Sequence, residues 1–165
     1  KYAALESVIN YIVNKSRTDL HIINNDIWAR CKETVIKVLE KNHVKDDEFK
    51  IIKDKIDNAN YLGFSEKINM ACHEYNVKID DLWPIGGKFG LSSIRNKFIH
   101  GHDFAPSTYG ALQGAREHLR WILERILIGL LGWPIEKTTV NSAYLGKNSA
   151  VYNELNKDIT ALKRE

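Results

Sequence analysis

Two polar side chains near the middle of the chain, Asn96 and His100, have a spacing that lets both reach one substrate. Positions four apart lie on the same side of an α-helix, one turn from each other. Arg95 precedes them on the flank of this predicted helix. An imidazole exchanges a proton near neutral pH, and a guanidinium binds two phosphate oxygens at once. The three residues therefore indicate proton transfer at a phosphate group.

The same residues also fit a purely structural role, which spacing alone favours. Arg95 would then pair with Asp103 or Glu117, and His100 would cap the end of its helix. A metal site is a further alternative, because His100, His102 and Asp103 are metal-ligand types close together in sequence. The ligands that would complete such a site cannot be identified, and we therefore predict a site without metal or other cofactor.

Positive charge is concentrated around these residues. Residues 86–125 hold six of the 24 Lys and Arg but only three of the 21 Asp and Glu, which accounts for the whole net charge of +3. A local basic surface with histidines suits a partner that carries phosphate. The alternative, ranked first on charge alone, is a solvated helix face on which Arg116, Arg120 and Glu124 form an i, i+4 ladder.

Apolar residues recur at spacings of three and four along most of the chain, and period-two alternation does not persist, so we predict an all-α bundle of five to seven helices. The longest helix should be central. Asp80–Gly90 and Thr138–Asn148 are expected to be loops. The predicted helices cover residues 5–13, 20–38 with a cap at Thr18 or Asp19, 46–62, 65–75, 89–100, 107–131 and 151–162.

The apolar residues predict an inner face for these helices, as two examples show. Ile27, Cys31 and Val35 should be buried by the helix over 20–38. In the helix over 89–100, the stripe that contains Phe98 should pack in the core, opposite Asn96 and His100.

Length and composition exclude several classes of protein. A chain of 165 residues that is 44% hydrophobic and 27% charged is expected to fold as a single domain, residues 1–165. Its apolar runs are shorter than the roughly 20 residues of a membrane span. Two well-separated cysteines argue for a reducing, cytoplasmic location. Because the first residue is Lys1, we expect a processed chain or part of a longer one with further domains.

The segment Arg-Asn-Lys-Phe-Ile-His-Gly, residues 95–101, resembles the signature of the HEPN domains, which are small all-helical bundles. It is preceded by Leu-Ser-Ser-Ile and followed by a turn and a long apolar helix ending in Leu-Leu-Gly-Trp. This context is most similar to the Apea-like HEPN branch, associated with phage defence. The resemblance covers about Asp81 to Trp133, whereas residues 1–76 are similar only in being helical.

The resemblance implies a metal-independent endoribonuclease that acts as a homodimer, in defence or as a toxin. Arg95, Asn96 and His100 are the residues of the motif, and they would cleave RNA by attack of its 2′-hydroxyl. A HEPN module that only dimerises or binds a nucleotide is the alternative, and a helical interaction domain is a third. Further candidates are Lys97, Arg116 and Arg120 for RNA contacts, His118 for the same cleft, and Phe104, Tyr109 and Trp121 for the dimer contact.

Overall fold

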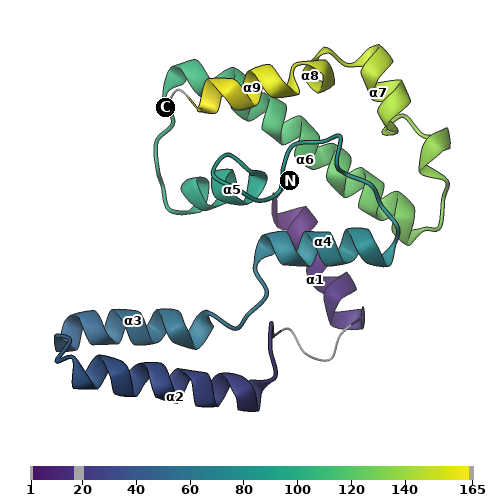
Figure 1. The fold of residues 1–165 in the computed structure, drawn as a ribbon. Helices are drawn as coiled ribbons and strands as arrows, with labels where there is room; N and C mark the ends of the chain where they lie inside the picture. The colour runs from purple at the N-terminus through teal and green to yellow at the C-terminus, as the bar shows by residue number, and fades with distance from the viewer. Residues whose placement is uncertain (1, 17–20, 164–165) are drawn as a thin grey trace. The chain divides into compact units, whose positions relative to one another are not determined.

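The computed structural model describes residues 2–16 and 21–163, and within these ranges it is entirely helical (Figure 1). The prediction of an all-α protein is confirmed. The described residues form nine α-helices rather than five to seven, together with two short 3₁₀-helices, Pro106–Thr108 and Ile135–Lys137. The α-helices are α1 Tyr2–Ser16, α2 Asn25–Lys41, α3 Asp46–Asn58, α4 Phe64–Glu74, α5 Leu91–Ile99, α6 Tyr109–Leu130, α7 Ser142–Asn148, α8 Ala150–Asn153 and α9 Leu155–Leu162.

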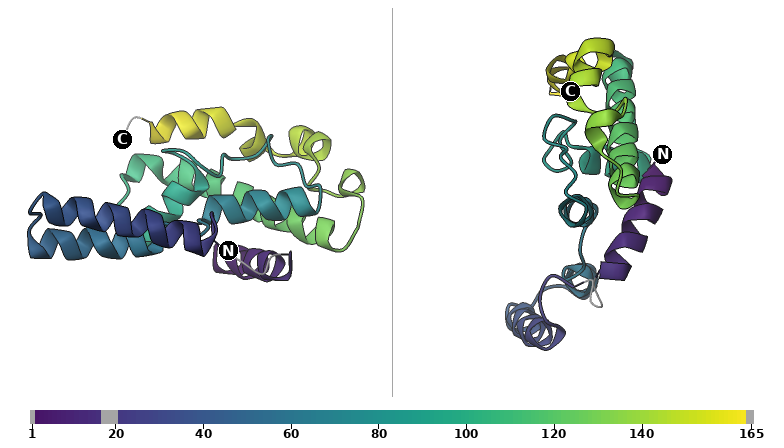
Figure 2. Two further views of the ribbon diagram at one scale, coloured as in Figure 1. Left: turned by 60° about the horizontal axis from the view of Figure 1, so that its bottom comes forward. Right: turned by 90° about the vertical axis from the view of Figure 1, so that its right-hand side faces the viewer.

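The chain divides into two compact units, one made of Lys1–Val13 with Phe64–Glu165 and the other of Asn14–Gly63. The larger unit is built around α6, as predicted for the longest helix. α6 buries residues at helical spacing, including Ala115, Leu119 and Ile122, and α9 runs beside it (Figures 1 and 2). Buried side chains of α1, α4 and α5 add to this core, and so do Leu82 and Trp83 of the segment before α5; those of the three helices include Leu5, Ile9, Ile12, Val13, Ile68, Ala71, Leu91 and Ile94.

The C-terminal part of the larger unit contains more helices than predicted. Residues 138–148, expected to be a loop, contain α7, because the side chain of Asn141 accepts a hydrogen bond from the Tyr144 N–H and caps its start. The single helix predicted over 151–162 is two helices, and the hydroxyl of Ser149 caps the first of them. The polar caps Asn141 and Ser149 therefore each begin a helix in this segment.

The smaller unit is a helical hairpin of α2 and α3, which run side by side (Figures 1 and 2). α2 begins at Asn25, where the side chain of Asn24 accepts hydrogen bonds from the backbone of the first turn. The caps predicted at Thr18 and Asp19 lie outside the described residues.

The inner face predicted for α2 is wrong. Ile27, Cys31 and Val35 are all exposed, because α3 packs against the neighbouring face of the helix. No helix within the described ranges is long and apolar enough to cross a membrane.

Candidate functional site

The polar motif lies at the C-terminal end of α5, and the start of that helix is tightly held. The backbone N–H of Leu91 and that of Ser92 donate to the carbonyls of Pro84 and Ile85. A Cβ on the preceding Gly90 would collide with the backbone of Gly86, so only glycine fits this approach. The predicted loop before α5 therefore anchors the helix, while Leu91 and Ile94 bury its inner face.

Asn96 and His100 are both exposed, as their spacing predicts. His100 is the residue that ends α5, and Gly101 follows with a φ of 67°. The prediction for Phe98 is wrong, because its side chain is 54% exposed. Its ring lies against that of Phe104, with centroids 4.8 Å apart, and it also lines an open apolar hollow beside α6. The polar face thus ends in an imidazole open to solvent.

Arg95 is held within its own protomer by Glu6 of α1. Nη2 of Arg95 lies 2.8 and 2.9 Å from the two carboxylate oxygens of Glu6, and the guanidinium lies 5.2 Å from the ring centroid of Phe64. Its side chain is only 20% exposed. An ion pair was one of the interpretations of the sequence, but the partner is neither Asp103 nor Glu117. Glu6 is 89 residues away in sequence, and no local spacing could identify it.

The Arg95 guanidinium also orients Asn96. Nη1 of Arg95 donates to Oδ1 of Asn96 across 3.3 Å. With this oxygen engaged, the amide N–H groups of the exposed Asn96 remain as donors for a bound group. Glu6, Arg95 and Asn96 therefore form a chain of contacts that leads from α1 to the exposed face of α5.

The remaining basic residues do not join this face. Nζ of Lys97 lies 5.2 Å from the ring centroid of Phe104. Arg120 bonds to Glu117 at 3.0 Å and to Glu124 at 3.5 Å, which confirms the ladder for this residue. The two carboxylates offset the positive charge of Arg120.

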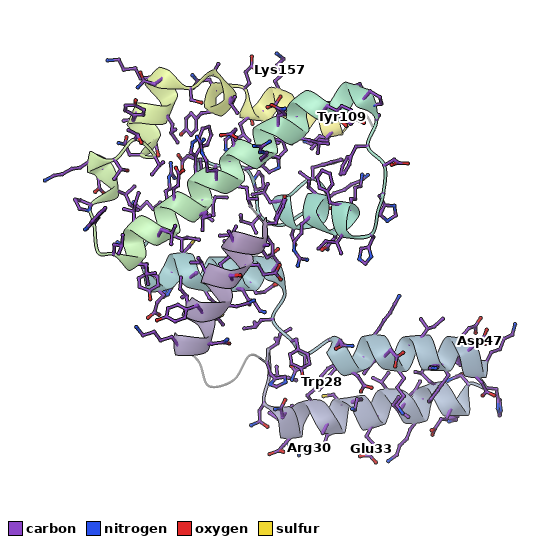
Figure 3. All side chains as sticks on the ribbon, turned by 180° about the vertical axis from the view of Figure 1, so that it is seen from behind. Trp28, Arg30, Glu33, Asp47, Tyr109 and Lys157 are labelled. Carbon is purple, nitrogen blue, oxygen red and sulfur yellow. The ribbon has the colours of Figure 1, made fainter. Side chains whose placement is uncertain are left out.

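Arg116 is exposed, but it lines an apolar hollow on another side of α5. The hollow has a volume of about 630 Å³ and includes Ile94, Phe98 and Tyr109, the last at the start of α6 (Figure 3). Because consecutive residues turn by about 100°, Phe98 and His100 point in nearly opposite directions. The structure therefore does not bring Arg116 to the motif.

Two of the proposed dimer contacts are wrong. Phe104 is 9% exposed and Trp121 is 4% exposed, because both pack inside the larger unit. Tyr109 is 57% exposed, so it remains a candidate for the dimer contact.

A partly buried polar network in the same unit was not recognised in the sequence. Arg125 forms two bonds to the carboxylate of Asp81, at 2.6 and 2.8 Å, and the hydroxyls of Ser142 and Tyr152 donate to the same carboxylate. Burial alone would raise the pKa of Asp81, but these hydrogen bonds and the charge of Arg125 bring it well below its usual range. Arg125, counted above as part of the basic surface, is thus a core residue.

His118 belongs to this interior as well, so the suggestion that it lines the motif's cleft is wrong. It has no exposed surface, and its Nδ1 accepts a hydrogen bond from the backbone N–H of Trp83 across 3.2 Å. Burial lowers the pKa of His118 to about 4, because the imidazolium would lose its hydration. It is therefore a neutral core residue.

No group of three or more His, Cys, Asp or Glu side chains within residues 2–16 and 21–163 is arranged to hold a metal ion. Comparisons with family models, curated proteins and solved structures found no match to this chain. The resemblance to HEPN domains is neither supported nor excluded by them and stays a prediction.

Proposed function

We propose that this chain is a metal-independent endoribonuclease that acts in the cytoplasm, in antiphage defence or as a toxin, with a site composed of two protomers. The observation that carries the proposal is the exposed pair on α5. Asn96 and His100 lie open to solvent, one turn apart, and the amide of Asn96 is oriented by Arg95. An imidazole and an amide donor so placed suit proton transfer beside a phosphate.

In the proposed reaction, His100 takes the proton of an RNA 2′-hydroxyl as that oxygen forms a bond to the adjacent phosphorus. The bond from phosphorus to the 5′ oxygen breaks, and His100 of the partner subunit donates a proton to that leaving oxygen. The products are a 2′,3′-cyclic phosphate and a 5′-hydroxyl. Two-fold symmetry supplies one base and one acid from a single motif.

The contact with Glu6 refines the role of Arg95. Because Nη2 is engaged by both oxygens of Glu6, the positive charge of Arg95 is partly offset within the protomer. We assign Arg95 first to positioning Asn96, with Nη1 as the part of the guanidinium nearest to a phosphate on the exposed face. Stabilisation of the extra negative charge then comes from this Nη1 and from the Asn96 amide.

One observation favours a second candidate function. The ion pair with Glu6 is also what a non-catalytic HEPN module would keep, since it ties α5 to α1 without any substrate. Such a module would dimerise or bind a nucleotide for a larger protein.

Cleavage of mixed RNA in excess chelator distinguishes the two functions. The purified chain should give products with 2′,3′-cyclic phosphate ends, and His100→Ala and Arg95→Ala should each lower the rate by at least about 100-fold. His102→Ala is the matched control, because His102 is an exposed histidine outside the motif and should keep the wild-type rate. Cleavage that requires a divalent metal, or that survives in His100→Ala, would contradict the nuclease. Tight nucleotide binding without cleavage would favour the module.

A further inference from the structure

The apolar hollow beside α5, with its volume of about 630 Å³, is lined only by residues of the larger unit. Its floor belongs to the core, because Ile94 of α5 and Ala115 and Leu119 of α6 are at most 4% exposed. The ring of Tyr2 adds to the wall, since its hydroxyl donates to the carbonyl of Leu91 across 3.1 Å. Hollows of this volume with mostly apolar walls are typical of small-molecule sites.

One edge of the hollow is polar. Tyr109, Gln113 and Arg116 follow one another on α6 at spacings of four and three, so they lie within about 60° of the helix circumference (Figure 3). All three side chains are exposed, and none has a hydrogen-bond or ion-pair partner among the described residues. A hydroxyl, an amide and a guanidinium are thus aligned beside an apolar floor. A few polar groups at the margin of an apolar hollow are what fixes the orientation of a bound ligand.

Arg116 gives this edge a single positive charge. It is the only charged residue among the described residues that line the hollow. None of the four positions one turn away from it on α6 is acidic. Its charge is therefore not offset by an ion pair, whereas Arg120 in the next turn contacts two glutamates. A guanidinium binds a carboxylate through two parallel hydrogen bonds, and the nearby apolar surface strengthens such a contact.

We propose that this hollow binds an amphipathic monocarboxylate with an unbranched aliphatic tail. The carboxylate would contact Arg116 and the Gln113 amide, and the tail would lie on the apolar floor. One negative charge matches the one cation, whereas a phosphate monoester would bring nearly two. The lining positions on α6 run from Tyr109 to Leu119, about 15 Å along the helix axis, which suits an extended chain of about ten carbons better than a compact ring.

The proposed ligand site and the motif lie on different faces of α5. Ile94 and Phe98 line the hollow, whereas Asn96 and His100 point in nearly the opposite direction. A ligand in the hollow would therefore contact the helix that carries the motif without touching its exposed polar side chains. The inference stands whether or not the chain cleaves RNA.

Isothermal titration calorimetry with decanoate at pH 7 tests the proposal. One decanoate should bind per chain, with a Kd of about 0.1–1 mM for a ligand of this size. Each buried methylene contributes about fourfold in affinity, so octanoate should bind roughly tenfold more weakly. Decyltrimethylammonium has the same tail and the opposite charge, and it should bind at least about tenfold more weakly than decanoate.

Two variants separate the contribution of the charge from that of the apolar wall. Arg116→Gln should weaken the binding of decanoate by at least about tenfold and should not weaken that of decyltrimethylammonium. Arg120→Gln is the matched control, because Arg120 is an exposed arginine of the same helix outside the hollow, and it should keep the wild-type affinity. Phe98→Ala removes a wall but no charge, so it should weaken both ligands by the same factor. Circular dichroism should show that all three variants stay folded.

Three results would overturn the proposal. The first is the absence of saturable binding of one decanoate per chain up to about 5 mM, which is also the result expected if a second copy of the chain covers the hollow. The second is equal affinity for decanoate and decyltrimethylammonium. The third is an equal loss of decanoate affinity in Arg116→Gln and Arg120→Gln. None of these measurements uses RNA, so a failure here is distinct from a failure of the proposed nuclease.

Discussion

The neutral, buried imidazole of His118 should make the stability of this protein depend on pH. In the folded chain the ring has no exposed surface and accepts a hydrogen bond from the backbone of Trp83. Burial lowers its pKa from 6.5 to about 4. In the unfolded chain the imidazole is hydrated and takes up a proton as the pH falls through 6.5. Folding must then displace that proton.

The sign and size of the effect follow from proton linkage. Between pH 6.5 and pH 4 the unfolded state binds more protons than the folded state at this residue, so the free energy of unfolding falls as the pH falls. The contribution of the neutral His118 to the free energy of unfolding is fully present above pH 6.5 and is lost as the pH approaches 4. The difference between the two pKa values corresponds to about 3 kcal/mol, of which about 2 kcal/mol is lost by pH 5.

The measurement is urea unfolding, followed by circular dichroism, of the wild type and of His118→Asn at pH 7, 6, 5 and 4. Asn keeps an oxygen near the position of Nδ1 as acceptor for the Trp83 N–H, but it does not titrate. Other groups titrate alike in both proteins, so the wild-type advantage over the variant should shrink by about 3 kcal/mol from pH 7 to pH 4. A change below about 1 kcal/mol would refute the assignment of His118 as a neutral core residue.

Two further predictions concern the larger unit. Gly110→Ala should raise the free energy of unfolding by up to about 1 kcal/mol, because the new methyl meets nothing within 4 Å and alanine favours the helix. Gly129→Ala in the same helix should lower the free energy of unfolding by about 1–3 kcal/mol, because its Cβ would lie 2.7 Å from Val77. Equal urea midpoints for the two variants would contradict this packing. Arg125→Ala should lower the free energy of unfolding by about 3 kcal/mol at pH 7, because it leaves the carboxylate of Asp81 without its ion pair, and an unchanged thermal unfolding midpoint would count against it.

The local sequence determined the helices and which residues share the exposed face of α5. Periodic apolar residues predicted an all-α protein with a long central helix, because a helix buries one stripe and the period of that stripe is set by backbone geometry. The same geometry predicted that Asn96 and His100 would share an exposed face, since a spacing of four aligns them in any helix. Neither result depended on what packs around them.

Tertiary structure alone decided which charges pair between segments distant in sequence and which apolar faces are covered. Glu6 reaches Arg95 and Asp81 reaches Arg125 only because segments distant in sequence come together, and a pattern of spacings carries no information on such pairs. For the same reason His118 was assigned to a cleft although the core encloses it, and Ile27 was assigned to a core although nothing in its unit covers it. A periodic stripe specifies that a helix has an apolar face, but the partner that covers this face is set by the packing of the whole chain.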